Sequence, residues 1–236
     1  MAKTPKTCYS VGDPHLRKFD GFAFDSHAEG WKTLYAKDDL VIQLQQAKWN
    51  ARVAINRAVR FSTNGGSTWD QTLMDGQHTI KDFASPNVRL TVQSVDFSRF
   101  AWATHKHIYN VYVTTSEYEG ATGQCTQGKL RRRLDSSDTS GGVAFPSGAE
   151  VKVSKQQAEE ACADLTEQKQ NCVTDMRMVN EPEAVDKIKE DFGTVETTVK
   201  ALATFTPSLP LTEVISSATG AHLCLAVIAT LMVSML

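Results

Sequence analysis

The sequence lacks an excess of charge of either sign. Its 25 Lys and Arg residues nearly balance 27 Asp and Glu residues, which gives a formal net charge of −2 at pH 7. The basic field that attracts nucleic acid or an anionic lipid surface is therefore missing, and we expect no nucleic-acid partner. With 41% hydrophobic and 22% charged residues, the composition is nevertheless typical of a folded globular protein rather than of a disordered one.

Signatures of common catalytic sites are also missing. The chain has no Gly-x-Ser-x-Gly nucleophile elbow, no His-Glu-x-x-His zinc motif and no P-loop. His105 and His107 alternate along one predicted strand near His78, and without a carboxylate at a fixed spacing we interpret them as surface or sheet histidines. The basic run 129–133 (KLRRR) is interpreted as part of a solvated loop, the alternatives being a processing site and a polyanion contact. We therefore expect a protein that is not an enzyme.

The first ten residues contain no apolar signal-peptide core, whereas the chain ends in an apolar run, 223–236 (LCLAVIATLMVSML). As a helix this run spans about 21 Å, less than the ~30 Å hydrocarbon core of a bilayer. Small residues precede it, and among them Ser216 and Ser217 are candidate positions for GPI attachment. The tail predicts a membrane attachment at the C-terminus through a GPI anchor. A retained membrane span and a buried terminal helix are the alternatives.

Five cysteines are present, and Cys224 lies within the apolar tail. The other four, Cys8, Cys125, Cys162 and Cys172, form no Cys-x-x-Cys pair and have no cluster of histidines beside them, which disfavours a zinc site. An even set of this kind is typical of disulfides formed in an oxidising compartment, with three possible connectivities. We expect two disulfides and an extracellular location.

Short hydrophobic segments predict β-strands across about residues 20–115. Leu40, Ile42 and Leu44 alternate with polar or exposed positions in one of these segments, as in a half-buried strand. Turn signals separate the segments; they are Asn64-Gly65-Gly66, Asp75-Gly76 and Ser85-Pro86-Asn87. Strands at this spacing, with no helical pattern between them, predict a mainly β protein built as an antiparallel β-sandwich of short strands.

A polar loop at 119–142 separates this region from a small helical segment at 154–192. Ser154 is a candidate cap for a helix from Lys155 to about Gln170. A second helix is predicted for 183–192, between Pro182 and Gly193, since proline favours helix starts and glycine favours helix ends. Residues 195–205 predict a further helix and 206–222 a linker to the tail.

The most specific pattern is the string CYSVGDPHLRKFDGFAF at 8–24. Asp13-Pro14 is a turn dipeptide, and Asp20-Gly21 predicts a tight corner that places Phe19 and the aromatics after it on the core side. The motif residues are Gly12, Asp13, Pro14, His15, Phe19, Asp20 and Gly21. This string resembles the opening of von Willebrand factor type D domains.

Two later segments agree with the same resemblance. Residues 120–125 (GATGQC) are similar to the family's motif after its last long strand, and 162–176 is similar to the helix-borne cysteine pair that closes many such domains. The resemblance covers about 8–192. It leaves 1–7 as an N-terminal extension, 193–222 as a helix and linker, and 223–236 as the tail.

The resemblance implies a non-enzymatic adhesion or matrix module, extracellular or at the cell surface, that acts through protein–protein contacts, including self-association. A GPI-anchored receptor or co-receptor for a protein ligand is the alternative, because a GDPH string with a GPI tail is also similar to repulsive guidance molecules. The resemblance further implies that Cys8 pairs with Cys125 and that Cys162 pairs with Cys172.

Two further properties follow only from the resemblance. One is a calcium site beside the first disulfide, with Asp20 at the family's ligand position and Gln127, Asp135 and Asp138 as the candidate ligands after the second cysteine. The other is self-cleavage between Asp13 and Pro14, in which Asp13 attacks its own carbonyl with the assistance of His15.

Overall fold

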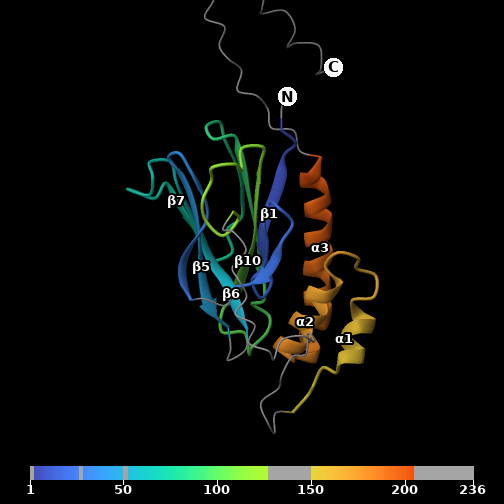
Figure 1. Ribbon diagram of the computed structural model, residues 1–236. Coiled ribbons are helices and arrows are strands. Elements are labelled where there is room, and N and C mark those ends of the chain that lie inside the picture. The colour runs from blue at the N-terminus through green and yellow to red at the C-terminus, as the bar shows by residue number, and fades with distance from the viewer. Residues whose placement is uncertain (1–2, 27–28, 50–52, 127–149, 205–236) are drawn as a thin grey trace, which may run out of the picture.

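Two antiparallel sheets stack face to face in the computed structural model, which describes residues 3–26, 29–49, 53–126 and 150–204 (Figure 1). The first sheet has the strand order β3-β2-β1-β10-β9-β8, and the second has the order β4-β5-β6-β7. The strands of the first sheet are β1 (Lys6–Val11), β2 (His15–Arg17), β3 (Ala23–Asp25), β8 (Thr79–Phe83), β9 (Val88–Asp96) and β10 (His107–Thr115). Those of the second are β4 (Gly30–Lys37), β5 (Leu40–Lys48), β6 (Ala54–Ser62) and β7 (Gln71–Leu73). The predicted antiparallel sandwich is confirmed.

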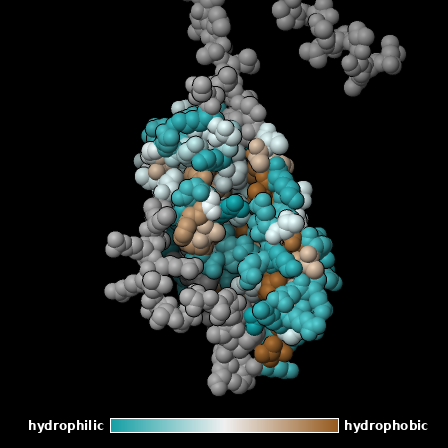
Figure 2. Space-filling view, turned by 45° about the vertical axis from the view of Figure 1, so that its right-hand side comes forward, coloured by the Kyte–Doolittle hydropathy of each residue, from teal (hydrophilic) through white to brown (hydrophobic). Residues whose placement is uncertain are grey.

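A layer of helices covers the other face of the larger sheet, so that the fold has three layers (Figure 1). Its members are α1 (Lys155–Ala161), α2 (Lys169–Val179), the 3₁₀ turn η1 (Pro182–Ala184) and α3 (Val185–Ala203). The helix α3 runs beside β1, and Figure 2 shows a mostly hydrophilic surface over this part of the molecule, broken by small separate hydrophobic patches. The helices therefore use their apolar residues against the sheet.

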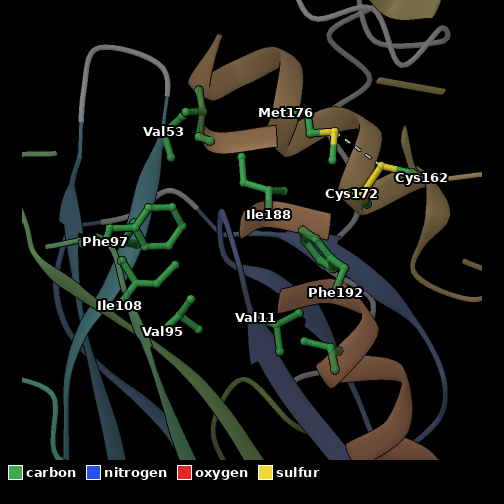
Figure 3. Packing of buried hydrophobic residues seen from close by; sticks show 14 of the residues in the cluster. Val11, Val53, Val95, Phe97, Ile108, Cys162, Cys172, Met176, Ile188 and Phe192 are labelled. Carbon is green, nitrogen blue, oxygen red and sulfur yellow. Dashed lines mark hydrogen bonds between the residues drawn. A yellow bond between two sulfur atoms is a disulfide. The ribbon is translucent and has the colours of Figure 1, made fainter. Parts of the chain in front are cut away.

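Two hydrophobic cores result from this layering. One fills the space between the sheets and includes Leu34, Ile42, Leu44 and Val111. The other lies between the larger sheet and the helices; Figure 3 shows Val11, Val95, Phe97, Ile108, Ile188 and Phe192 within it. Since the larger sheet is covered on both faces, β10 is buried from Ile108 to Thr115 rather than on alternate residues.

The strand region begins earlier than the sequence predicts. β1 and β2 precede residue 20, and β1 is a central strand that pairs with β10 and β2. In contrast, β5 follows its prediction, because Leu40, Ile42 and Leu44 are buried while the residues between them are partly exposed. Alternation locates a strand with one covered face, but it does not reveal β1, whose last four residues are all buried.

The predicted helix from Lys155 to Gln170 is wrong in its length. Ser154 does cap α1, through a capping box with Gln157, yet α1 ends at Ala161 and α2 begins only at Lys169. The carboxylate of Glu196 on α3 accepts hydrogen bonds from the backbone N–H of Thr166 at 2.6 Å and of Gln168 at 3.0 Å, at the start of α2. The N–H groups just before α2 are thus paired by a residue of another helix, and this pairing cannot be predicted from the residues next to them in sequence.

The predicted helix end at Gly193 is also wrong, because α3 continues through it to Ala203. The residues after the glycine hold the helix in place: Val195 and Glu196 are buried against the sheet and α2, and Leu202 is buried near the helix end. Glycine in a helix interior costs about 1 kcal/mol relative to alanine. Burial of the second half of α3 exceeds this cost, so the helix does not stop.

Candidate functional site

The GDPH turn connects β1 to β2 and points toward the helices. Gly12 has φ +58°, and its N–H donates to the side-chain oxygen of Asn110 on β10 at 3.1 Å. A Cβ atom here would clash with Oδ2 of Asp175 and would lie 2.9 Å from Cζ of Phe192. The turn therefore requires glycine for two reasons, its left-handed backbone and the close approach of α2 and α3.

His15 joins three elements, the neighbouring strands β2 and β3 and the distant helix α2. Its Nε2 lies 2.6 Å from Oδ1 of Asp175 on α2, and its Nδ1 lies 2.8 Å from Oδ1 of Asp25 at the end of β3. The side chains of His15 and Asp175 are only 7% and 8% exposed, whereas that of Asp25 is 57% exposed. We call His15, Asp13, Asp25, Asp175 and Asp191 the His15 cluster.

The two ring nitrogens of His15 face carboxylates, which fixes its charge. Burial lowers the pKa of His15, but the negative charge of Asp175 and the hydrogen bonds to Asp175 and Asp25 outweigh it and raise the pKa to about 10. At neutral pH the ring is therefore an imidazolium that donates from both nitrogens. It serves as a charged clamp between the sheet and α2.

Asp13 is buried and contacts the second oxygen of the Asp175 carboxylate, whose first oxygen binds His15. Its backbone N–H donates to Oδ2 of Asp175 at 3.0 Å, and its own Oδ1 accepts from the backbone N–H of Ala54 at 2.9 Å. Burial, followed by the charge of Asp175, raises the pKa of Asp13 to about 8, although the bond from Ala54 and the charge of His15 act in the opposite direction. The Asp13 carboxyl is consequently protonated at neutral pH.

A fourth carboxyl group comes from α3. Asp191 accepts a hydrogen bond of 2.7 Å from the side-chain amide of Asn110, the residue that also receives the N–H of Gly12. Burial raises the pKa of Asp191 to about 7, against the effect of the bond from Asn110. Asn110 thus connects the turn to α3, while Asp175 connects it to α2.

Each buried member of the His15 cluster has a hydrogen-bond partner within the protein. Its one charged histidine and the carboxylate of Asp175 compensate each other in a buried position, and the raised pKa of Asp13 removes a charge that would otherwise repel Asp175. This arrangement locks the helical layer onto the sheet.

Both disulfides that the resemblance implied are present. Cys8 on β1 is bonded to Cys125 across a sequence separation of 117, with the Cα atoms 5.6 Å apart. Cys162 at the end of α1 is bonded to Cys172 on α2, with a separation of 10. Figure 3 shows the second bond at the edge of the sheet–helix core. One bridge ties the turn region to the segment after β10, and the other joins two helices.

The Phe19-Asp20-Gly21 segment forms the predicted tight corner between β2 and β3. The N–H of Lys18 donates to the carbonyl of Phe22 at 2.9 Å, and Gly21 has φ +84°. Phe19 is buried, as predicted, whereas Phe22 and Phe24 stack on each other and remain partly exposed. The expectation that these aromatics face the core is therefore correct for Phe19 and in part for Phe24, which packs against the core between the sheets.

Of the four predicted calcium ligands, only Asp20 is among the described residues; Gln127, Asp135 and Asp138 lie outside them. The Asp20 carboxylate is exposed and accepts a hydrogen bond of 2.9 Å from the N–H of Phe22 within its own turn. Residues 3–26, 29–49, 53–126 and 150–204 contain no group of three His, Cys, Asp or Glu side chains that could hold a metal ion. The described part of the predicted site thus offers a single carboxylate.

The predicted attachment residues Ser216 and Ser217, the tail 223–236 and the basic run 129–133 also lie outside the described residues. Within the described ranges, no helix is both long and apolar enough to cross a membrane.

Sequence reasoning found Gly12, Asp13 and His15 but missed the groups that pair with them. Asp175 and Asp191 lie on the buried faces of α2 and α3, each among apolar neighbours such as Met176 and Phe192. An acidic residue inside an apolar helical stripe is the signal that would have identified them, because a buried carboxylate needs a partner.

A scan of the chain against protein-family models finds no match, and a search of curated protein sequences finds none either.

Proposed function

We propose that the chain is an extracellular, non-enzymatic adhesion or matrix module similar to von Willebrand factor type D domains. In this proposal its C-terminus holds it at a cell surface, and it acts through contacts with other proteins, including copies of itself. The observation that supports the proposal is the way in which the GDPH turn is packed against the helices. Its histidine and aspartate are buried and paired with the helices, as expected of a structural joint rather than of an open catalytic centre.

The covalent frame supports the same function. A disulfide of sequence separation 117 fixes the first strand to the segment after the last one, and a second disulfide joins two helices. Such bonds are typical of proteins outside the cell, where the environment is oxidising. A sandwich restrained in this way presents its loops in fixed positions, which favours specific binding because little conformational freedom is lost.

Surface localisation of the full chain tests this proposal. Intact cells are stained for the protein before and after treatment with phosphatidylinositol-specific phospholipase C, and peptides are mapped without reduction. We expect surface staining that the enzyme releases, together with the two disulfides. A cytosolic protein with free thiols at Cys8, Cys125, Cys162 and Cys172 would contradict the extracellular function. Light scattering on the released protein then measures self-association.

A second candidate function is a GPI-anchored receptor or co-receptor that cleaves itself between Asp13 and Pro14. One observation favours it: the Asp13 carboxyl is protonated at neutral pH because burial and Asp175 raise its pKa to about 8. In the reaction, a carboxyl oxygen bonds to the Asp13 carbonyl carbon, the bond to the Pro14 nitrogen breaks, and the carboxyl proton passes to that nitrogen. Water then opens the cyclic anhydride to two carboxyl groups.

Mass spectrometry of the protein, reduced after mild acid treatment, tests the second candidate. Cleavage yields a fragment that ends at Asp13, which an Asp13→Asn variant should not produce. Detection of the intact chain alone would reject self-cleavage. A monomer in light scattering that binds one protein tightly would favour the receptor over the self-associating module.

A further inference from the structure

A polar pocket of about 400 Å³ opens beside β6, and none of its lining residues belongs to the His15 cluster. Volumes of about 300–1,000 Å³ are typical of small-molecule sites. The pocket is lined by Gln45, Arg57, Ala58, Met74, Asp75, Thr104, His105, Lys106 and His107. The lining contains two cationic residues and two histidines but only one carboxylate. This local excess of basic groups is unusual for a chain of net charge −2. We call this site the His105 pocket.

Arg57 reaches the pocket because of an irregularity in β6. Gln45 pairs with Ala58 and Gln46 pairs with Asn56, so that Arg57 is the extra residue of a β-bulge. Bulges redirect side chains and are frequent at binding sites. Arg57 is exposed, and among the described residues it forms no ion pair. Its guanidinium is therefore available to a ligand.

Arg60 on the same strand provides the contrast. Its guanidinium lies 4.0 Å from the ring centre of Trp31 and 3.7 Å from that of Trp69. It also donates two hydrogen bonds, of 2.9 and 2.7 Å, to the side-chain oxygen of Gln43. Arg60 is thus fully engaged within the protein, whereas Arg57 is not.

The His107 ring packs against a turn beside the pocket. The His107 ring lies over Gly76, where a Cβ atom would approach Cε1 of the ring to 2.9 Å. Gly76 belongs to a turn in which Asp75 and Gly76 both have positive φ, and its N–H donates to the hydroxyl of Tyr109 at 3.0 Å. Because Gly76 has no side chain, the turn leaves room for the His107 ring at one wall of the pocket.

His105 is a group of the pocket whose charge responds to pH. Burial and the nearby charge of Arg57 lower the pKa of His105, against a hydrogen bond with the backbone of Lys48. The ring is therefore neutral at pH 7 and gains a proton in more acidic solution. The other charged groups around it are those of Asp75 and Lys106, and Asp96 lies 3.9 Å from His107.

From this geometry we propose that the His105 pocket binds a sugar that carries a sulfate or phosphate monoester. Arg57 supplies a charged donor for the oxyanion, and His105 becomes a second one where more acidic solution protonates its ring. Gln45 and Thr104 line the pocket with groups suited to sugar hydroxyls, and Met74, 42% exposed, offers an apolar surface for the sugar ring. This ligand goes beyond the protein–protein contacts proposed above and does not depend on them.

Isothermal titration calorimetry with the full chain tests the inference. The probes are N-acetylglucosamine 6-sulfate, N-acetylglucosamine 6-phosphate, neutral N-acetylglucosamine and inorganic sulfate. We expect at least one of the charged sugars to bind about tenfold more tightly than neutral sugar or sulfate alone, and their relative affinities distinguish a sulfated from a phosphorylated source. Absence of binding for both charged sugars at pH 5.5 would overturn the inference.

Variants connect the binding to the pocket. Arg57→Ala should weaken the affinity roughly tenfold or more, because a hydrogen bond to a charged group is lost. Lys81→Ala removes the same charge from the exposed edge strand β8 and should leave the affinity within about twofold. Equal weakening by the two variants would indicate unspecific attraction and would overturn the site.

The pH dependence provides an independent measurement. Affinity for the sulfated sugar should increase as the pH falls from about 8 to about 5.5, because the sulfate keeps its charge while His105 gains one. His105→Ala should reduce this dependence. Affinity that is independent of pH in the unmodified protein would contradict the role of His105.

Discussion

The two interior interfaces of this protein are stabilised by different kinds of polar groups. Between the sheets, several buried bonds join neutral groups: the amide of Asn56 donates to the backbone carbonyls of Ser10 and Tyr109, and the hydroxyl of Ser26 donates to the side-chain oxygen of Gln46. The carboxyl of Asp13, which accepts from the N–H of Ala54, is an ionisable exception there. Between the larger sheet and the helices, the bond from His15 to Asp175 joins two charged groups and the bond from Asn110 ends on the ionisable Asp191, beside a neutral bond from Gln168 to Tyr9. Hydrogen bonds between neutral groups do not change with pH, whereas those of ionisable groups depend on whether the groups are protonated. The helical layer is therefore the part whose attachment responds to its surroundings.

The largest expected effect comes from the disulfide that begins in the sheet. Replacing Cys8 and Cys125 together by alanine should lower the free energy of unfolding by about 4–5 kcal/mol, since the bond closes a loop of 117 residues. Replacing Cys162 and Cys172 should lower it by only about 2–3 kcal/mol, because that loop is short. Urea unfolding of the full chain measures both. An equal loss for the two pairs would indicate that loop closure does not set their contributions.

Removal of the central carboxylate should have the next largest effect. Asp175→Ala leaves the charge of His15 without its closest partner in a buried position, which should cost about 3–5 kcal/mol. Asp175→Asn retains an acceptor for the N–H of Asp13 and should cost less. The partly exposed neighbour Thr174→Ala is the matched control, with an expected change below about 0.5 kcal/mol. A loss for Asp175→Ala no greater than for Thr174→Ala would show that the clamp is not stabilising.

The pH dependence of stability distinguishes the two interfaces directly. The folded protein holds protons on Asp13 and Asp191, with pKa values of about 8 and about 7 against an ordinary 3.8, and on His15, with a pKa of about 10 against 6.5. Each raised value contributes stability that is complete below the ordinary pKa and is lost as the pH rises through the folded one. Unfolding free energy should therefore decline from about pH 5 to pH 9.

Asp13→Asn and Asp191→Asn should flatten this decline below about pH 8, while the contribution of His15 persists to about pH 10. Hydrogen exchange at pH 5 and pH 9 then shows where stability is lost, and we expect a larger loss of protection in α2 and α3 than in β5 and β6. A uniform change over both sheets and helices would contradict the difference between the interfaces.

The smallest expected effect concerns α3. Gly193→Ala should increase the free energy of unfolding by about 0.5–1 kcal/mol, because the residue is in a helix interior and nothing lies within 4 Å of the added Cβ. If Gly193 ended the helix, as its sequence context suggests, the substitution would instead be destabilising. Thermal unfolding of the variant and of the unmodified protein shows whether the substitution stabilises or destabilises the fold.

Particular residues show how far sequence reasoning reaches. Ser154 caps its helix, Leu40, Ile42 and Leu44 face a core, and Asp20-Gly21 forms its corner, because each of these features depends on neighbours within a few residues. The pattern around Gly193 predicts a helix end because the contacts that continue α3 come from distant segments, such as the bond from Gln93 to Thr198 over 105 residues. The sequence indicates a surface or sheet histidine at position 105, and the fold brings this residue into one pocket with Arg57.

The antiparallel β region with helices after it, the even set of cysteines and the GDPH turn can all be predicted from the chain alone. Periodicity, turn residues and composition act locally or on average, so they can be read along the chain. The contact of the turn with Asp175 and the raised pKa values of Asp13 and Asp191 depend on the folded structure, since burial and charge at one point are set by which distant segments pack there. Both faces of β10 are buried for the same reason: a second layer covers each of them.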